Sequence, residues 1–263
     1  MPLNPRTRAS LVELIPHGTL ATRNWLLAKG LSHHSLDNLV KSGQLISISK
    51  GVYIRPETVL KWEGVVSSLQ RMGSDLVLGG LSALEKHGLT HYVSMSEQKT
   101  IHVYGFDTLP SWINRLGLSV TFRRHGNFQI WGEANPGGPN LCKKFTVDMP
   151  WSEFSLPLRV SPPERAICEV LNDVPEAFSF EHADQLMQGL PGLSPRRLKE
   201  ILRLLKSVKV KRLFFWLAER QNHAWFKKLD PSQFDLGRGK RVFVEEGKLN
   251  KKYQILVPKE MHG

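Results

Sequence analysis

Short apolar stripes at helical spacing run through the first sixty residues, separated from one another by glycine and proline. They predict three helices, of which the second is capped by Thr22 and the third by Ser32. Two apolar segments then flank a turn around Lys50, as in a strand pair. The predicted elements are helices over residues 6–15, 23–29 and 32–41, and strands over 44–47 and 52–55. Three short helices followed by a hairpin are typical of a winged helix-turn-helix.

The rest of the pattern predicts a mixed sheet followed by several helices. A helix over residues 57–72 would connect the two parts, and helices near 195–228 carry many basic residues. The other predicted elements are strands over 75–78, 100–104, 118–123, 128–131 and 143–147, helices over 81–87, 110–116, 163–171, 181–190, 195–206 and 208–221, a hairpin at about 242–248, and a strand over 253–257. The sequence therefore predicts an α+β protein, with a winged helix-turn-helix over residues 1–60 and a mixed α/β domain over residues 61–263.

Composition and charge narrow the class of protein. Of the 263 residues, 41% are hydrophobic and 23% are charged, which is ordinary for a folded chain. Lysine and arginine number 36 against 24 acidic residues, so the net charge is +12, which favours a polyanionic partner such as double-stranded DNA. The sequence has no apolar run of membrane length and no signal peptide, and we expect a cytoplasmic protein. Two cysteines, Cys142 and Cys168, without a ligand cluster predict neither a disulfide framework nor a metal, and we expect no cofactor.

Candidate DNA contacts lie on the outer face of the third predicted helix and in the hairpin. Residues 1–60 contain seven basic and three acidic residues, and the helix face carries polar groups that can bond to bases or phosphates. The candidates are Arg6, Arg8, Arg23, His33, His34, Ser35, Asn38, Lys41, Ser49, Lys50 and Arg55. A solvated polar face, or a winged helix that binds another protein, is the alternative interpretation.

A second basic segment lies between residues 196 and 228, where eleven basic residues face only two acidic ones. Its candidate surface comprises Arg196, Arg197, Arg203, Lys206, Lys209, Lys211, Arg212, Lys227 and Lys228. We expect these side chains to add phosphate contacts to the same duplex, while an acidic partner protein or a merely solvated face are the alternatives. The aromatic residues between them can stack on unpaired bases or pack in a core, and they are Phe214, Phe215, Trp216, Trp225 and Phe226.

Two enzyme classes have partial signatures in the sequence. Asp235, Glu246 and Lys248 resemble the Asp…Glu-x-Lys arrangement of Mg²⁺-dependent restriction-type nucleases, although the same residues suit a solvated hairpin turn. A nucleotidyltransferase needs paired carboxylates, and the chain contains no Asp-x-Asp motif. The sequence therefore favours a protein that is not an enzyme, with the nuclease as the alternative.

Five segments together resemble the AbiEi antitoxins of type IV toxin–antitoxin systems. They are Gly51-Val-Tyr-Ile-Arg55, Gly79-Gly-Leu-Ser-Ala-Leu-Glu-Lys-His-Gly-Leu89, Pro163-Glu-Arg-Ala-Ile-Cys-Glu-Val-Leu171, the Val208–Arg220 helix, and Leu236-Gly-Arg-Gly-Lys-Arg241 with Asn250–Pro258. The resemblance implies a transcriptional repressor that binds the promoter of its own operon through residues 33–41 and 50–55. It also implies that the C-terminal domain counters a cognate nucleotidyltransferase toxin without forming a stable complex with it.

Overall fold

The computed structural model describes residues 11–90, 98–126, 128–132, 145–151, 156–243 and 246–261. At the N-terminal end, a helix covers residues 11–14, and residues 6–10 of the predicted 6–15 helix lie outside the described range. It is followed by β1 (Ala21–Thr22), α2 (Arg23–Ala28), α3 (His33–Lys41), β2 (Ile46–Ser49) and β3 (Val52–Ile54). The three strands form an antiparallel sheet in the order β1-β3-β2. Thr22 and Ser32 cap α2 and α3 through their hydroxyl groups, which confirms both predicted helix starts.

This N-terminal unit has a small core of its own. Leu26 of α2 and Leu36 and Leu39 of α3 are buried together with Ile15 and Tyr53. The next helix, α4 (Trp62–Arg71), starts five residues later than the predicted 57–72 helix. The reason is local, because Glu57 has a φ of 61° and the N-cap residue of α4 has an extended backbone.

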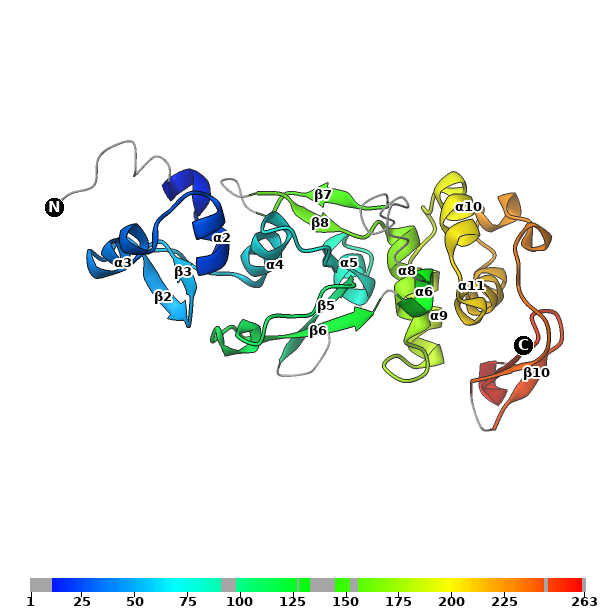
Figure 1. Cartoon of the computed structure of the whole chain (residues 1–263). Coiled ribbons are helices and arrows are strands. Elements are labelled where there is room, and N and C mark those ends of the chain that lie inside the picture. The colour runs from blue at the N-terminus through cyan, green and yellow to red at the C-terminus, as the bar shows by residue number, and fades with distance from the viewer. Residues whose placement is uncertain are drawn as a thin grey trace.

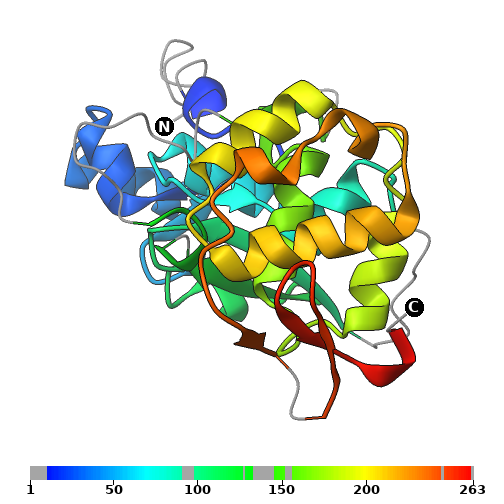
Figure 2. The same ribbon diagram turned by 90° about the vertical axis from the view of Figure 1, so that its right-hand side faces the viewer.

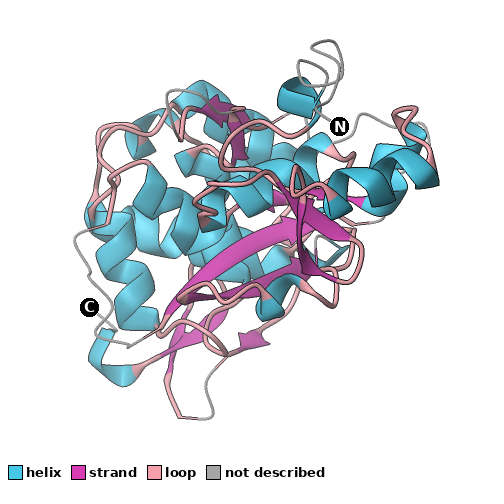
Figure 3. Cartoon of the chain, turned by 90° about the vertical axis from the view of Figure 1, so that its left-hand side faces the viewer, coloured by secondary structure: helices cyan, strands magenta, loops and turns pink. Residues whose placement is uncertain are grey.

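A five-stranded mixed sheet occupies the middle of the molecule. Its order is β6-β5-β4-β8-β7, and a parallel β5–β6 pair of seven residues is its longest ladder. The strands are β4 (Val77–Leu78), β5 (Lys99–Gly105), β6 (Val120–Gly126), β7 (Val147–Met149) and β8 (Leu158–Val160). Helix α5 (Gly80–Lys86) and the short 3-10 helix η1 (Ile113–Arg115) lie in the connections. Figure 3 shows this sheet with most helices gathered to one side of it.

Three elements in this region differ from the predicted ones. The segment 128–131, predicted as a strand, is helix α6 (Phe128–Trp131), in which the adjacent side chains of Ile130 and Trp131 are both buried and no strand alternation exists. The predicted strand over 143–147 becomes β7, which begins only at Val147, and residues 143 and 144 lie outside the described range. Strand β8 was not predicted, because three residues near prolines give too short a pattern.

The C-terminal half is helical and holds most of the core. Its helices are α8 (Pro163–Asn172), α9 (Phe180–Gln188), α10 (Pro195–Leu204) and α11 (Val208–Gln221), followed by the 3-10 helices η2 (Phe226–Lys228) and η3 (Pro231–Gln233). These bounds confirm four predicted helices. Helix α11 packs on α8 and α9, and the aromatic side chains of Phe214, Phe215, Trp216 and Trp225 are buried there. Base stacking by these four side chains is therefore excluded.

A small three-stranded sheet ends the chain. It contains β9 (Arg241–Val242), β10 (Lys248–Asn250) and β11 (Ile255–Val257), followed by the 3-10 helix η4 (Lys259–Met261). The predicted hairpin at 242–248 is wrong, because β9 and β10 do not pair with each other and both pair with the central strand β11.

The two basic parts of the chain lie at opposite ends of an elongated molecule. Figure 1 places α3 at one end and α10 and α11 toward the other, with the five-stranded sheet between them. Figure 2, which faces the second end, shows α10 and α11 in yellow and orange above the C-terminal strands in red. In the described part of the chain, no helix combines the length and the apolar character needed to cross a membrane.

Candidate nucleic-acid interface

Helix α3 presents one buried face and one polar face. Leu36 and Leu39 are 0% and 3% exposed and fix the helix against the N-terminal core. The opposite face carries the predicted contact residues His33, His34, Ser35, Asn38 and Lys41, all of which are exposed. The amide of Asn38 and the imidazole of His34 lie one helical turn apart, with 3.1 Å between Asn38 Nδ2 and His34 Nε2. This face offers hydroxyl, amide, imidazole and ammonium groups in one row, the groups that bond to base edges and phosphates.

Arg23 fixes the position of α3 within the N-terminal unit. Its Nη2 atom lies 2.8 Å from Asp37 Oδ1 on α3, and its Nε donates a 3.1 Å hydrogen bond to the hydroxyl of Tyr53 on β3. The bond to Tyr53 raises the pKa of Arg23, with a smaller contribution from Asp37. Arg23 was predicted as a direct DNA contact, but the structure gives it two partners and the role of a brace between helix and sheet.

The hairpin formed by β2 and β3 exposes one lysine side chain. Lys50 is exposed in the turn beside Gly51, whose φ of 71° suits a tight turn. Ser49 is half-buried, and its carbonyl accepts a 3.0 Å hydrogen bond from the Ser47 hydroxyl. Arg55 is also half-buried, and its Nη1 atom has no hydrogen-bond partner within the described residues. Lys50 is thus the most exposed of the contacts predicted in this hairpin. Arg6 and Arg8 lie outside the described range.

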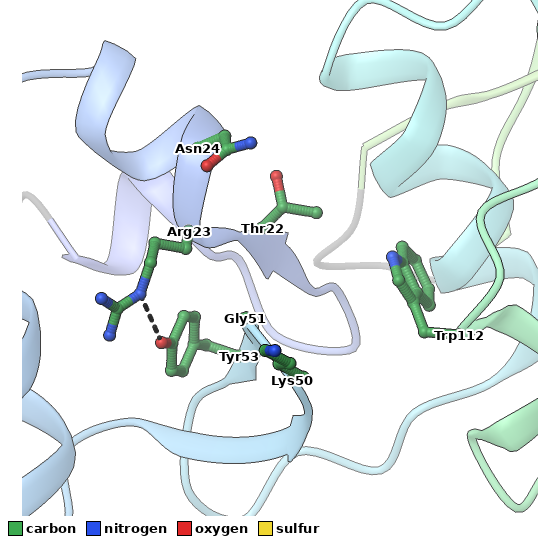
Figure 4. Close-up of a pocket in the computed structure, with 7 residues that line it drawn as sticks. All are labelled: Thr22, Arg23, Asn24, Lys50, Gly51, Tyr53 and Trp112. Atoms are coloured by element: carbon green, nitrogen blue, oxygen red, sulfur yellow. Dashed lines mark hydrogen bonds between the residues drawn. The ribbon is translucent and has the colours of Figure 1, made fainter.

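A groove of about 540 Å³ runs beside the β2–β3 hairpin (Figure 4). Thr22, Arg23 and Asn24 at the start of α2 line one side together with Lys50, Gly51 and Tyr53, and Trp112 lines the other side. Asn24 and Trp112 were not predicted from the sequence. Trp112 lies some sixty residues after the β2–β3 hairpin in the chain, and no local pattern could place it in this groove.

The N-terminal unit is attached to α4 by polar contacts. Arg71 of α4 donates hydrogen bonds to the carbonyls of Glu13 and Leu14, the latter at 2.6 Å, and its guanidinium lies 5.1 Å from the centre of the Trp25 ring. Burial lowers the pKa of Arg71. The Ser68 hydroxyl accepts a 2.9 Å hydrogen bond from the backbone N–H of Leu20. These contacts hold α3 in a defined orientation relative to the central sheet.

Fewer basic side chains of the 196–228 segment are exposed than predicted. Lys211 and Arg212 are 5% and 2% exposed, so their assignment to a basic surface is wrong. Burial lowers the pKa of each, and both side chains bond to main-chain carbonyls inside the protein. The remaining residues fall into two groups: Arg196, Arg197 and Lys209 lie within 4 Å of a glutamate oxygen, while Arg203, Lys206, Lys227 and Lys228 are exposed and form no ion pair within the described residues.

Two of the three residues proposed for a nuclease, Asp235 and Glu246, have structural partners of their own. Glu246 is exposed and lies 3.3 Å from Lys259, and the Asp235 carboxylate accepts a 2.8 Å hydrogen bond from the N–H of Gly237. Within the described residues, no group of three or more His, Cys, Asp or Glu side chains is arranged to hold a metal ion. Cys168 is a buried free thiol, and Cys142 lies outside the described range.

Comparison with known proteins identifies a matching family. A family model for a transcriptional regulator, the AbiEi antitoxin of a type IV toxin–antitoxin system, matches residues 97–258. A model for the N-terminal domain of the same antitoxin matches residues 6–95. The search of curated proteins gave no match. Among solved structures, the chain is similar to the RV2827C protein from Mycobacterium tuberculosis, with 14% sequence identity, a TM-score of 0.55, and coverage of 90% of this chain and 86% of that one. At this identity the likeness concerns the fold alone.

Proposed function

The chain belongs to the AbiEi antitoxin family of type IV toxin–antitoxin transcriptional regulators, and we propose that its N-terminal unit is a winged helix-turn-helix that reads operator DNA with α3. Membership in a family of transcriptional regulators implies DNA binding, and membership in a type IV system implies a cognate toxin. The arrangement of α2, α3 and the β2–β3 hairpin supports the winged-helix assignment, because the recognition helix of that fold is followed by such a hairpin.

The observation that carries this proposal is the division of α3 into two faces. His34, Ser35, Asn38 and Lys41 are exposed in one row, while Leu36 and Leu39 hold the helix from behind. In this proposal the row enters the major groove, and the Asn38 amide exchanges its contact with His34 for one with a base edge. Arg23 binds α3 directly through Asp37, and Arg71 ties the first helical turn of the N-terminal unit to α4 through the carbonyl of Leu14.

The wing and the groove beside it supply contacts to the DNA backbone. Lys50 at the wing turn reaches a phosphate on the flank of the site, and Asn24 and Trp112 line the groove next to it. Phosphate contacts of this kind set the register of the protein on the duplex without reading its sequence. A contact between the far-end residues Arg203 or Lys206 and the same duplex would require DNA that runs the length of the molecule.

The biological setting follows from the family. We place the operator in the promoter of the chain's own operon, so that the protein represses its own synthesis. The cognate toxin in this proposal is a nucleotidyltransferase, which the C-terminal part counters without a stable complex. In this proposal residues 1–60 read DNA, and residues 61–263 carry the antitoxin activity.

Two substitutions test the proposed interface. Asn38→Ala removes a base contact, so discrimination between operator and random DNA should fall by about 1–3 kcal/mol. Lys50→Ala removes a phosphate contact, so affinity for both DNAs should fall alike and the slope of log K against log salt should drop by about 1. Lys228→Ala, an exposed lysine on η2, is the matched control and should change neither. Equal losses of discrimination for Asn38→Ala and Lys50→Ala would place α3 outside the major groove.

A further inference from the structure

The loop over residues 235–241 is held in place from inside the protein. Arg212 of α11, at 2% exposure, donates hydrogen bonds to the carbonyls of Leu236 at 2.6 Å, Gly239 at 2.6 Å and Gln254 at 3.0 Å. The neighbouring Lys211 donates one of 3.0 Å to the carbonyl of Asp235. Two buried cations thus bind four main-chain oxygens, three of them in the loop. A buried cation without partners is costly, so this arrangement fixes the loop firmly.

The same arrangement leaves three successive backbone donors of the loop, at residues 238–240, without a partner among the described residues. Gly237 and Gly239 have φ values of 64° and 76°, the left-handed conformation that glycine adopts without strain. Arg238, Gly239 and Lys240 are exposed, and their backbone N–H groups make no hydrogen bond within the described residues. Successive free N–H groups in a loop of this kind form an anion-binding concavity. The backbone therefore provides donors where the side chains provide positive charge.

Positive side chains surround this loop. Arg238, Lys240 and Arg241 lie on it and form no ion pair in the part of the chain that the structure describes. The small sheet brings a further group close, because Ile255 of β11 pairs with Arg241 on one side and with Asn250 on the other. Two strand spacings, about 10 Å, separate Arg241 from Asn250, and the exposed Lys251 follows directly. Consecutive phosphates of a nucleic-acid strand lie several ångströms apart, a spacing that this set of cations can follow.

We propose that the Gly237–Arg241 loop, with Lys251, binds the phosphate backbone of a single-stranded nucleic acid at a site separate from the operator-reading helix. The separation is visible in Figure 1, where the C-terminal sheet and α3 lie toward opposite ends of the molecule. Backbone donors and cations that face the solvent suit a strand held by its phosphates rather than by its bases. The proposal does not depend on α3 binding DNA.

The test measures binding of the full chain to a fluorescein-labelled polyuridylate strand by fluorescence anisotropy. The double variant Arg238→Gln/Lys240→Gln should lower the affinity about tenfold and reduce the magnitude of the salt slope by about 1.4, since each phosphate that is no longer neutralised accounts for about 0.7. The matched control is Arg203→Gln/Lys206→Gln, two exposed cations of the α10 end without an ion pair among the described residues, which should change the affinity less than about twofold.

A backbone variant separates geometry from charge. At Gly239 an added Cβ meets no atom within 4 Å, so Gly239→Ala disturbs the left-handed loop without a clash and without a change of charge. Gly239→Ala should weaken polyuridylate binding several-fold. If the positive charge of the surface alone held the strand, the affinity would not change.

Four results would overturn the proposal. They are an unmodified chain that does not bind polyuridylate, equal losses for the two double variants, a parallel loss of operator-DNA affinity in Arg238→Gln/Lys240→Gln, and displacement of the strand by inorganic phosphate at constant ionic strength. The third would assign the loop to the operator contact, and the fourth would reduce it to a site for a free anion.

Discussion

The most informative perturbation of the fold is Glu169→Gln, because the side chain of Glu169 is completely buried and carries several contacts. Its Oε1 atom lies 2.7 Å from Arg165 Nε and accepts a 3.1 Å hydrogen bond from the Ser161 hydroxyl, and its Oε2 accepts a 2.9 Å bond from the N–H of Gly80. Arg165 and Glu169 are 1% and 0% exposed. Removing one partner of such a pair leaves a buried charge uncompensated, which costs about 3–5 kcal/mol.

The chain contains a matched exposed pair. Arg196 and Glu200 have the same spacing on a helix, but their side chains are 92% and 43% exposed and the closest N–O distance is 3.4 Å. An exposed pair of this type contributes about 0.3–0.5 kcal/mol. Glu200→Gln should therefore lower the free energy of unfolding by about 0.5 kcal/mol or less, while Glu169→Gln lowers it by about 3–5 kcal/mol.

Urea unfolding followed by far-UV circular dichroism measures both values. A similar small loss for the two variants would refute the claim that the Glu169 pair organises the junction of α5, α8 and the sheet. If Glu169→Gln fails to fold, Ser161→Ala tests the same cluster more gently, since it removes one hydrogen bond to Glu169 and should cost about 1 kcal/mol. No loss of stability in Ser161→Ala would contradict this role of Glu169 equally.

Two further predictions concern packing and pH. An added Cβ at Gly64 of α4 would lie 1.9 Å from the carbonyl oxygen of Gly18, so Gly64→Ala should displace the N-terminal unit and lower the unfolding temperature. At Gly192 an added Cβ meets no atom within 4 Å, so Gly192→Ala should leave the unfolding temperature unchanged. Equal unfolding temperatures for the two variants would contradict the close approach of Gly64 and Gly18. Burial and the nearby His125 lower the pKa of His102 to about 4, so the unfolded state binds the proton first as the pH falls from about 6.5, and stability should decline between pH 6.5 and 4. His102→Gln should flatten the pH dependence of the urea midpoint in that window, and an unchanged slope would assign the decline to other groups.

The sequence predicts best where local physics decides the structure. Ser32 caps α3 as expected, and Pro163 and Pro195 begin α8 and α10, because caps and prolines act on their own neighbourhood. The strand prediction for residues 128–131 was wrong because a short segment with three apolar residues in four suits a strand and a buried helix equally. Packing against α8 favours the helix at this segment.

The candidate site was predictable only in part. Polar residues on α3 follow from helical periodicity, which separates Asn38 from Leu39 without any knowledge of the fold. The burial of Lys211 and Arg212 could not be predicted from the sequence, because charged residues are usually exposed. These two side chains instead bond to carbonyls more than twenty residues away in the chain. Only the fold brings Trp112 to the groove beside the β2–β3 hairpin.

Directed cleavage of operator DNA tests most directly whether α3 enters the major groove. An iron chelate that generates hydroxyl radicals is tethered to a cysteine introduced by Ser35→Cys on α3 or by Arg196→Cys on α10, both exposed positions, and the unsubstituted chain treated with the same reagent sets the background. We expect strong cuts at the centre of the protected operator from position 35. Cuts from position 196 alone, with none from position 35, would show that α3 lies outside the groove and would contradict the proposed DNA-reading role.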